Sequence, residues 1–195
     1  MARPREFDEE KALHAAMQLF WEKGYEATSL SDLTAYMGIQ RPSLYSAFGD
    51  KIGLFEAALR TYTQAHAARI RAQLLNKPSV KEAFRSIFES IVQEGSDLHE
   101  GSGKGCFCIN TMVELAPHDA KFEVLTREHQ MYLAAIFQES IERGIQSGEL
   151  KSDMNAKAIA QALVISLIGV TVMMKSRPDE LFMRNSLHVI LQSLE

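Results

Sequence analysis

Hydrophobic residues recur at intervals of three and four along almost the whole chain. Leu13, Met17 and Phe20 show this spacing near the N-terminus, and the stretch 84–91 shows it again in the middle. Such spacing gathers apolar side chains on one side of an α-helix, whereas sustained alternation, which would indicate strands, is hard to find. The pattern therefore predicts an all-α protein.

Capping residues, glycines and prolines divide the pattern into about nine helices. Ser29 and Asp32 have the spacing of a capping box, Pro42 suits a first helical turn, and Asp50 can cap the long helix that follows it. Gly24 and Gly38 are typical of helix ends. The predicted helices are 8–24, 29–38, 42–49, 50–76, 80–98, 106–115, 120–145, 156–174 and 180–194.

The helix predicted at 156–174 includes the longest uncharged run, residues 158–174. A membrane span needs about 20 predominantly apolar residues, and this run is shorter and contains Gln161, Ser166 and Thr171. We interpret it as a helix with two apolar faces, one packed in its own domain and one against a partner chain. It predicts no membrane insertion, and a homodimer formed through helices 156–174 and 180–194.

The segment 28–54 has the organisation of a helix-turn-helix. Two short predicted helices flank a tight turn at residues 38–40, an arrangement in which the second helix can enter a DNA major groove. With Leu44 and Phe48 assigned to a small core, the outer surface of the second helix consists of Gln40, Arg41, Ser43, Tyr45, Ser46 and Ala47.

Three stretches, Gly24-Tyr25-Glu26-Ala27-Thr28-Ser29, residues 38–51 (GIQRPSLYSAFGDK) and Leu54-Phe55, resemble the DNA-binding domain of the TetR family of bacterial transcriptional regulators. The resemblance implies a homodimeric regulator, most often a repressor, that binds a palindromic operator and is released by a small-molecule effector. It also implies a helix-turn-helix DNA-binding domain at 1–59 and an effector-binding and dimerisation domain at 60–195.

The resemblance further implies roles for single residues in the first domain. Thr28, Tyr45 and Lys51 would contact phosphates, and Gln40, Arg41 and Ser43 would face base edges. The chemistry fits, because Lys51 is expected at a helix N-terminus, which favours a phosphate, and Arg41 can bind guanine O6 and N7 in a bidentate fork. Gln40 stands where the family usually has a Ser or Thr cap.

The charge balance restricts where DNA can bind. The chain has 21 Lys and Arg against 25 Asp and Glu, for a net charge of -4, and residues 1–60 contain seven basic and nine acidic residues. A protein that coats nucleic acid over its whole surface would be basic. DNA binding must therefore depend on a few well-placed side chains.

The larger domain is rich in Met and Phe, which are typical of adaptable apolar cavities. No ligand can be named from the sequence. An all-helical enzyme and a DNA-binding structural protein without an effector are alternatives, but we find no catalytic constellation, and the second class would not need 130 further residues of this composition. The candidate effector-binding residues are His66, Phe88, Phe107, Asn110, Met112, Glu114, His129 and Tyr132.

Two cysteines, Cys106 and Cys108, follow a glycine-rich stretch at 101–105. Neither a Walker-type phosphate loop nor the ligand spacing of a structural zinc site is present, so we expect no cofactor and no metal. Both cysteines could be buried packing residues, or Cys106 could be a redox or electrophile sensor, because a first helical turn and Lys104 would favour its thiolate. Few cysteines and the absence of an apolar leader predict a cytoplasmic protein.

Overall fold

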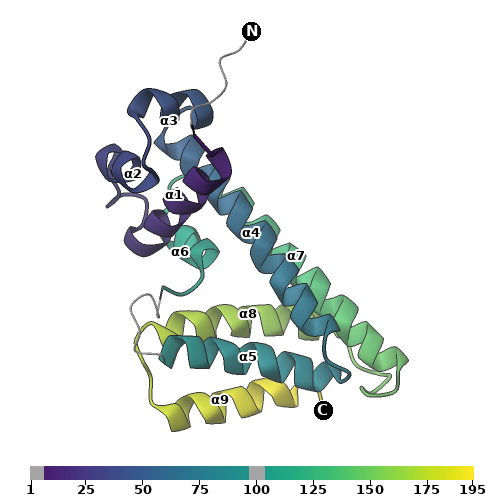
Figure 1. Cartoon of the computed structure of the whole chain (residues 1–195). Coiled ribbons are helices and arrows are strands. Elements are labelled where there is room, and N and C mark those ends of the chain that lie inside the picture. Colours follow the sequence, from purple (N-terminus) through teal and green to yellow (C-terminus); the bar gives the residue numbers. More distant parts are fainter. Residues whose placement is uncertain (1–6, 97–103) are drawn as a thin grey trace.

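A computed structural model describes residues 7–96 and 104–195, and within these residues the chain forms nine α-helices and no strand (Figure 1). The fold class is therefore as predicted, and α8 has the predicted bounds. Every other predicted bound in the described residues agrees within two residues, whereas the predicted end of α5 at Leu98 lies outside them. The helices are α1 Glu9–Lys23, α2 Leu30–Met37, α3 Arg41–Phe48, α4 Lys51–Leu75, α5 Val80–Ser96, α6 Phe107–Glu114, α7 Ala120–Gln146, α8 Ala156–Met174 and α9 Glu180–Gln192.

Local hydrogen bonds explain why the helices begin and end where they do. The Ser29 hydroxyl accepts from Asp32 N at 3.0 Å, and the Asp32 carboxylate accepts from Ser29 N at 3.0 Å, so the expected capping box is present. Gly38 ends α2 with φ 68°, in the left-handed region that glycine adopts without strain. Asp50 accepts from Gly53 N at 2.7 Å and so begins α4 directly after α3.

The upper part of the molecule has its own hydrophobic core, here called the upper core. It joins α1, α2, α3 and the first half of α4 with α6 and the start of α7. Four phenylalanines lie at its centre, and Phe55 contacts the other three edge-on, with centroid distances of 4.8 to 5.4 Å. Its largest fully buried side chains are Phe20, Leu33, Leu44, Leu54, Phe55, Leu59, Phe107 and Phe122.

A second core, the lower core, fills the space between α5, α7, α8, α9 and the second half of α4. It is mainly aliphatic, with Phe84 and Phe137 in edge contact at 4.9 Å. Glu149 fixes its border, because its carboxylate accepts from the Ser79 hydroxyl at 2.6 Å and from the backbone N–H groups of Val80 and Lys81. These hydrogen bonds favour the ionised carboxylate and lower the pKa of Glu149.

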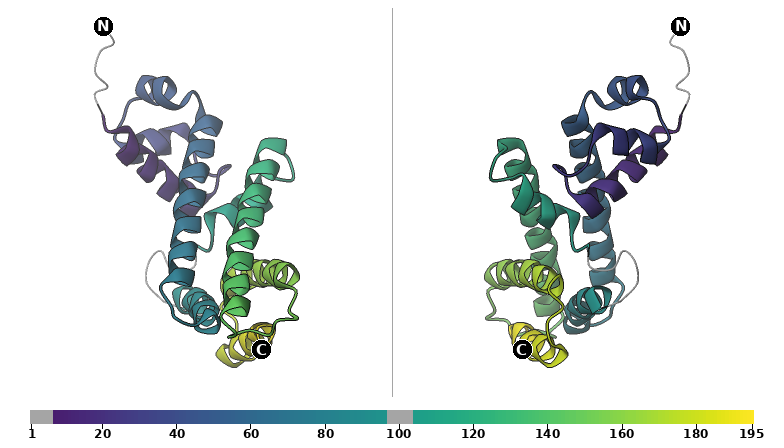
Figure 2. Two further views of the ribbon diagram at one scale, coloured as in Figure 1. Left: turned by 90° about the vertical axis from the view of Figure 1, so that its right-hand side faces the viewer. Right: turned by 90° about the vertical axis from the view of Figure 1, so that its left-hand side faces the viewer.

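Two long helices connect the cores. Figure 2 shows α4 and α7 rising from the lower core, with α6 between them near the upper end. Because α4 runs unbroken from Lys51 to Leu75, the predicted division after Leu59 falls inside one helix. The upper core also includes α6 and the start of α7, which the sequence placed in the second domain.

Helix α8 has two apolar faces, as predicted. Leu163, Leu167 and Val170 are buried in the lower core, whereas Ile165 is 71% exposed, and Gly169 has open space around it. By length and hydropathy alone α8 is the one helix of the described residues that could cross a membrane. Its packing against α5 and α7 is that of a core helix in a globular domain.

Candidate DNA-binding surface and ligand cavity

Helix α3 presents a polar surface to solvent at the upper end of the molecule. Leu44 is completely buried and anchors the helix, while Gln40, Arg41 and Tyr45 are exposed and Ser43 is half-buried. Gln40 begins the helix without a side-chain capping hydrogen bond, so its amide is available for contacts outside the chain. The expected base-reading residues therefore lie together on one accessible face.

The side chain of Arg41 rests on α2 in this structure. Its Nη2 atom donates to the Ser31 hydroxyl at 2.8 Å, and both residues are exposed. The donor is a charged guanidinium, but both groups are exposed and water competes for them, so a guanine base can replace this hydrogen bond at little cost. The contact keeps the guanidinium near the surface that would face DNA.

Lys51 is the first residue of α4, beside α3. Its Nζ atom lies 4.1 Å from the centre of the Tyr25 ring, within range of a cation–π interaction. The first backbone N–H groups of α4 and the positive end of its helix dipole both lie at this N-terminus, and both favour a bound anion. This placement agrees with the phosphate contact expected for Lys51.

Thr28 does not have the surface position expected for a phosphate contact. Its side chain is 0% exposed, and its hydroxyl donates to the Gly24 carbonyl at 2.6 Å. The hydroxyl therefore cannot reach a phosphate in this conformation, and this residue assignment is wrong for the structure described here. Thr28 instead stabilises the segment between α1 and α2.

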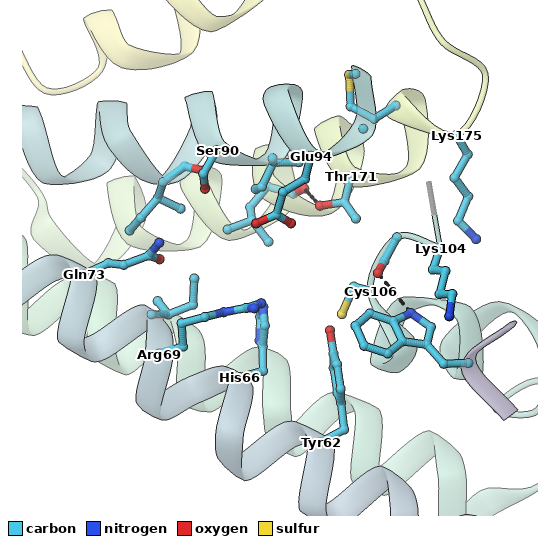
Figure 3. Close-up of a pocket in the computed structure, with 18 residues that line it drawn as sticks. Tyr62, His66, Arg69, Gln73, Ser90, Glu94, Lys104, Cys106, Thr171 and Lys175 are labelled. Atoms are coloured by element: carbon cyan, nitrogen blue, oxygen red, sulfur yellow. Dashed lines mark hydrogen bonds between the residues drawn. The ribbon is translucent and has the colours of Figure 1, made fainter. Parts of the chain in front are cut away.

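A cavity of about 330 Å³ lies where the upper and lower cores meet (Figure 3). Helices α4, α5 and α8 and the segment before α6 surround it. Its aromatic side is formed by Trp21 and Tyr62 in edge contact at 5.0 Å, and the Tyr62 ring stacks on His66. The lining residues are Trp21, Tyr62, His66, Arg69, Ile70, Gln73, Ile87, Ser90, Ile91, Glu94, Gly95, Lys104, Gly105, Cys106, Leu167, Thr171, Met174 and Lys175.

Two histidines form a buried pair beside this cavity. Nδ1 of His66 on α4 lies 3.1 Å from Nε2 of His129 on α7, so one ring donates to the other. Burial lowers the pKa of His66 to about 3, helped by repulsion from a protonated His129 ring and from Arg69, and burial lowers the pKa of His129 to about 4. Both rings are therefore neutral at neutral pH.

The chain is similar to known proteins in both sequence and structure. The family model "Bacterial regulatory proteins, tetR family" matches residues 12–58, and "Tetracyclin repressor-like, C-terminal domain" matches residues 81–187. The regulator YezE of Bacillus subtilis is 34% identical over 196 residues, covering 100% of both chains. The chain belongs to the TetR family of bacterial transcriptional regulators.

Other members of the TetR family are similar over most of their length. The transcriptional repressor ComR of Escherichia coli is 34% identical over 172 residues, which cover 87% of this chain and 80% of ComR. A cysteine mutant of the TetR family regulator CifR, solved in complex with a 26-base-pair operator DNA, is 32% identical with a TM-score of 0.81 and 98% coverage of both chains. These relatives are regulators, so the enzyme alternative has no support among them.

Several residues proposed from the sequence to contact the effector of this TetR protein do not line the cavity. Phe88 is fully buried in the lower core, and Phe107 is buried in the upper core against Phe55. Met112 packs on the upper core, and Tyr132 is 51% exposed on the surface of α7. None of these four residues lines the main cavity, because an apolar or aromatic residue on a helix does not reveal which of two cores it enters.

Asn110 lies behind the cavity wall, where it supports two lining residues. Its amide donates to the Lys104 carbonyl at 3.0 Å, and its Oδ1 atom accepts from the Lys175 ammonium group. Among the eight candidates, His66 lines the main cavity, and His129 contacts it through His66. His129 also borders a much smaller cavity of about 20 Å³, together with Cys108.

Glu114 connects α6 to the DNA-binding half rather than to a ligand. Its carboxylate accepts from Tyr25 N at 3.1 Å and from Glu26 N at 3.0 Å. These hydrogen bonds connect α6 to the segment between α1 and α2. A Cβ atom at Gly24, which has φ 84°, would lie 3.0 Å from both carboxylate oxygens. The close approach of Glu114 thus requires glycine at this position, and the expected effector contact is corrected to a structural one.

The main cavity also contains residues that the sequence analysis missed. Tyr62, Arg69 and Gln73 were not among the candidates, and they lie with the predicted His66 on the face of α4 that borders the cavity. Their spacing of three and four places polar groups where core residues would be expected. This pattern in the sequence could have indicated a cavity. Glu94 on α5 faces them, and Ile87, Ser90, Ile91 and Glu94 line the cavity with the same spacing of three and four.

Both cysteines are free and buried, and the sensor role expected for Cys106 stays a prediction. Cys106 lines the main cavity and precedes α6, but burial raises the pKa of its thiol, and Lys104 forms an ion pair with Glu22 at 3.6 Å instead of favouring a thiolate. The expected thiolate is therefore wrong. Burial also raises the pKa of Cys108, and no cluster of three or more His, Cys, Asp or Glu residues that could hold a metal occurs in the described part of the chain.

Proposed function

We propose that this TetR-family regulator is a cytoplasmic repressor that binds a palindromic operator as a homodimer and is released by a small-molecule effector. The observation that carries the proposal is the exposed polar face of α3, held in place by the buried Leu44. The operator complex of CifR and the repressor ComR support it, because both are similar over most of this chain.

In this proposal α3 enters the major groove. Gln40, Arg41 and Ser43 contact base edges, while Tyr45 and Lys51 contact phosphates at the groove margin. Arg41 leaves Ser31 to bind a base, and Lys51 remains close to Tyr25, which aligns its ammonium group. A two-fold dimer places two such helices about 34 to 36 Å apart on a palindromic site.

The experiment is a binding titration on the operator, found by footprinting the promoter region, at several salt concentrations. Arg41→Ala should cost about 1 to 3 kcal/mol and relax the preference at one base pair. Lys51→Ala should weaken all sequences alike and reduce the salt slope by about one unit. Arg127→Ala is the control, because Arg127 is exposed on α7 and paired with Glu123. Unchanged affinity and base preference for Arg41→Ala would refute its role.

The proposed dimer uses the faces of α8 and α9 that the lower core leaves exposed. Ile165 and Val172 on α8 and Phe182 and Val189 on α9 are large apolar side chains in contact with solvent in the single chain. Ala162 and Gly169 on α8 allow close approach of a second helix. Equilibrium sedimentation at micromolar concentration should show a dimer, and a monomer would contradict this part of the proposal.

The geometry also suggests how ligand binding in the cavity affects the DNA-binding surface. Cys106 borders the cavity immediately before α6, and Glu114 ends the same helix with two hydrogen bonds to the segment that contains Tyr25. The Tyr25 ring in turn contacts Lys51. A ligand that shifts α6 therefore changes the position of a phosphate-binding residue without touching α3.

A second candidate function is sensing of electrophiles or oxidants by Cys106. It is favoured by one observation: the Cys106 sulfur faces the cavity beside the Tyr62 hydroxyl (Figure 3). The test compares operator release by peroxide, hypochlorite and N-ethylmaleimide in wild type, Cys106→Ser and Cys108→Ser. Release that is equal in wild type and Cys106→Ser would return both cysteines to buried packing residues.

A further inference from the structure

We propose that the cavity binds a small organic monocarboxylate with an apolar body, and that Arg69 binds its carboxylate group. The inference rests on the proposed effector role of the cavity and specifies the chemical class of the ligand. The ligand class follows from a comparison of the charged groups around the cavity, some of which have a partner in the protein and some of which do not.

Positive charge predominates among the described lining residues. Arg69, Lys104 and Lys175 border the cavity, against one acidic residue, Glu94. Lys104 is in an ion pair with Glu22, and the Lys175 ammonium group donates to Asn110. Arg69 has no ion pair or hydrogen bond with any described residue, so within this part of the chain none of its five donors has a protein partner.

The guanidinium group of Arg69 suits a carboxylate better than other ligands of similar size. Its planar fork can form two parallel hydrogen bonds to a carboxylate, and these charge-assisted hydrogen bonds are stronger than hydrogen bonds between neutral groups. Figure 3 shows the Arg69 side chain at the cavity beside His66. The nearby Tyr62, His66 and Cys106 groups are uncharged at neutral pH, since burial shifts each of their pKa values toward the neutral form.

The remaining walls indicate the shape of the rest of the ligand. Trp21 and Tyr62 form an aromatic side, and Ile70, Ile87 and Leu167 form an aliphatic side. Together they can cover an aryl or alkyl group, and the volume of about 330 Å³ is at the small end of ligand pockets. The ligand is therefore a small amphiphile, with its charge at Arg69 and its apolar body toward these walls.

Glu94 restricts the ligand to a single negative charge. It extends from α5 into the space opposite Arg69 and forms no ion pair with a described residue. A second carboxylate or a phosphate dianion would be repelled there. The arrangement thus selects a monocarboxylate over a dicarboxylate with the same apolar body.

The test uses matched ligands on the full-length protein. Calorimetry and thermal shift compare phenylacetate, 3-phenylpropanoate and octanoate with phenylacetamide, 3-phenylpropanamide and octanamide, and compare 3-phenylpropanoate with the dianion benzylmalonate. At least one carboxylate should bind about 10- to 100-fold tighter than its amide, since a charge-assisted bidentate contact is lost in the amide. Benzylmalonate should bind more weakly than 3-phenylpropanoate in wild type and gain affinity in Glu94→Gln.

Variants of two neighbouring arginines identify the binding group. Arg69→Gln should remove the preference for the carboxylate, and because Arg69 is exposed, the variant should fold normally. Arg71→Gln is the matched control, because Arg71 lies on the same helix but pairs with Glu139 at 2.8 Å and does not line the cavity. Equal binding of every acid and amide, or a carboxylate preference that survives Arg69→Gln, would overturn the proposal.

Operator release is measured separately, so the two proposals can fail independently. A carboxylate that binds through Arg69 without releasing DNA would leave the ligand class intact and contradict the effector role. Release of DNA by neutral compounds that bind equally well to Arg69→Gln would support the effector role and reject the carboxylate.

Discussion

The upper and lower cores are built in different ways. In the upper core, Phe55 of α4 contacts Phe20 of α1, Phe107 of α6 and Phe122 of α7, so residues from distant parts of the sequence meet at one ring. The lower core is mainly aliphatic and is formed by α5, α7, α8 and α9 with the end of α4. The DNA-binding half therefore depends on α6 for its packing, whereas the lower half is complete without α6.

Two glutamates show the same contrast in polar chemistry. Glu114 binds two backbone N–H groups between α1 and α2, and Glu149 binds two backbone N–H groups and a hydroxyl at the start of α5. Both link distant segments, separated by 89 and 70 residues at most. Only the Glu114 contact reaches the DNA-binding half, so we expect similar effects on stability but different effects on operator binding.

The largest expected effect comes from removing the ring at the centre of the upper core. Phe55→Ala and Phe137→Ala, its counterpart in the lower core, should each lower the free energy of unfolding by about 3 to 5 kcal/mol. Urea unfolding followed by fluorescence of Trp21, the single tryptophan, reports on the upper core, and far-UV circular dichroism reports on all helices. Phe55→Ala should shift the fluorescence transition more than the dichroism transition. Identical shifts in both variants would show that the two cores unfold as one.

A smaller effect is expected from acid at the junction of the cores. The pKa values of His66 and His129 are lowered to about 3 and about 4 in the folded chain, below the ordinary value of about 6.5. Their contribution to stability is therefore complete above about pH 6.5 and is lost as the pH falls toward 4 and then 3. When the pH falls from 7 to 5, each histidine becomes protonated in the unfolded chain but not in the folded chain. This difference should lower the free energy of unfolding by about 2 kcal/mol per histidine.

The pH effect is checked by urea unfolding at a series of pH values. A His66→Gln/His129→Gln double variant should show a shallower dependence over this window than wild type. His188→Gln is the control, since His188 is exposed on α9. Parallel curves for wild type and the double variant would exclude the buried pair as the cause.

The smallest expected effect separates the two glutamates. A glutamine side chain has one acceptor oxygen, so Glu114→Gln and Glu149→Gln should each lose about 1 to 2 kcal/mol of stability. Glu114→Gln should also weaken operator binding severalfold, because the segment at Tyr25 is less firmly held, whereas Glu149→Gln should bind as wild type does. Operator titrations of both variants measure this difference, and equal affinities would show that the Glu114 contact has no role in positioning the DNA surface.

Local features of the sequence were sufficient for most of the fold. The caps at Ser29 and Asp50 and the glycine at 38 determine helix bounds through hydrogen bonds within four residues, so they can be recognised without a structure. The two faces of α8 followed from spacing alone, since Leu163 and Ile165 lie on opposite sides of any regular helix.

The site residues that were misassigned or missed depend on contacts between distant segments. Glu114 binds Tyr25, 89 residues away, and Trp21 donates to the Gly105 carbonyl, 84 residues away. The burial of Thr28 likewise depends on how α1 and α2 pack. No local pattern specifies which glutamate will find a backbone partner or which threonine will be covered, so these residues could be placed only from the three-dimensional structure.

The unbroken helix α4 has a geometric consequence for operator spacing. Its 25 residues, at about 1.5 Å each, make a rod of about 37 Å that ends at Lys51. If the lower end is fixed by the lower core, a tilt of about 5° displaces the Lys51 end by about 3 Å, close to the rise of one base pair in B-DNA. A rotation too small to disturb core packing is therefore enough to put a half-site out of register by one base-pair step.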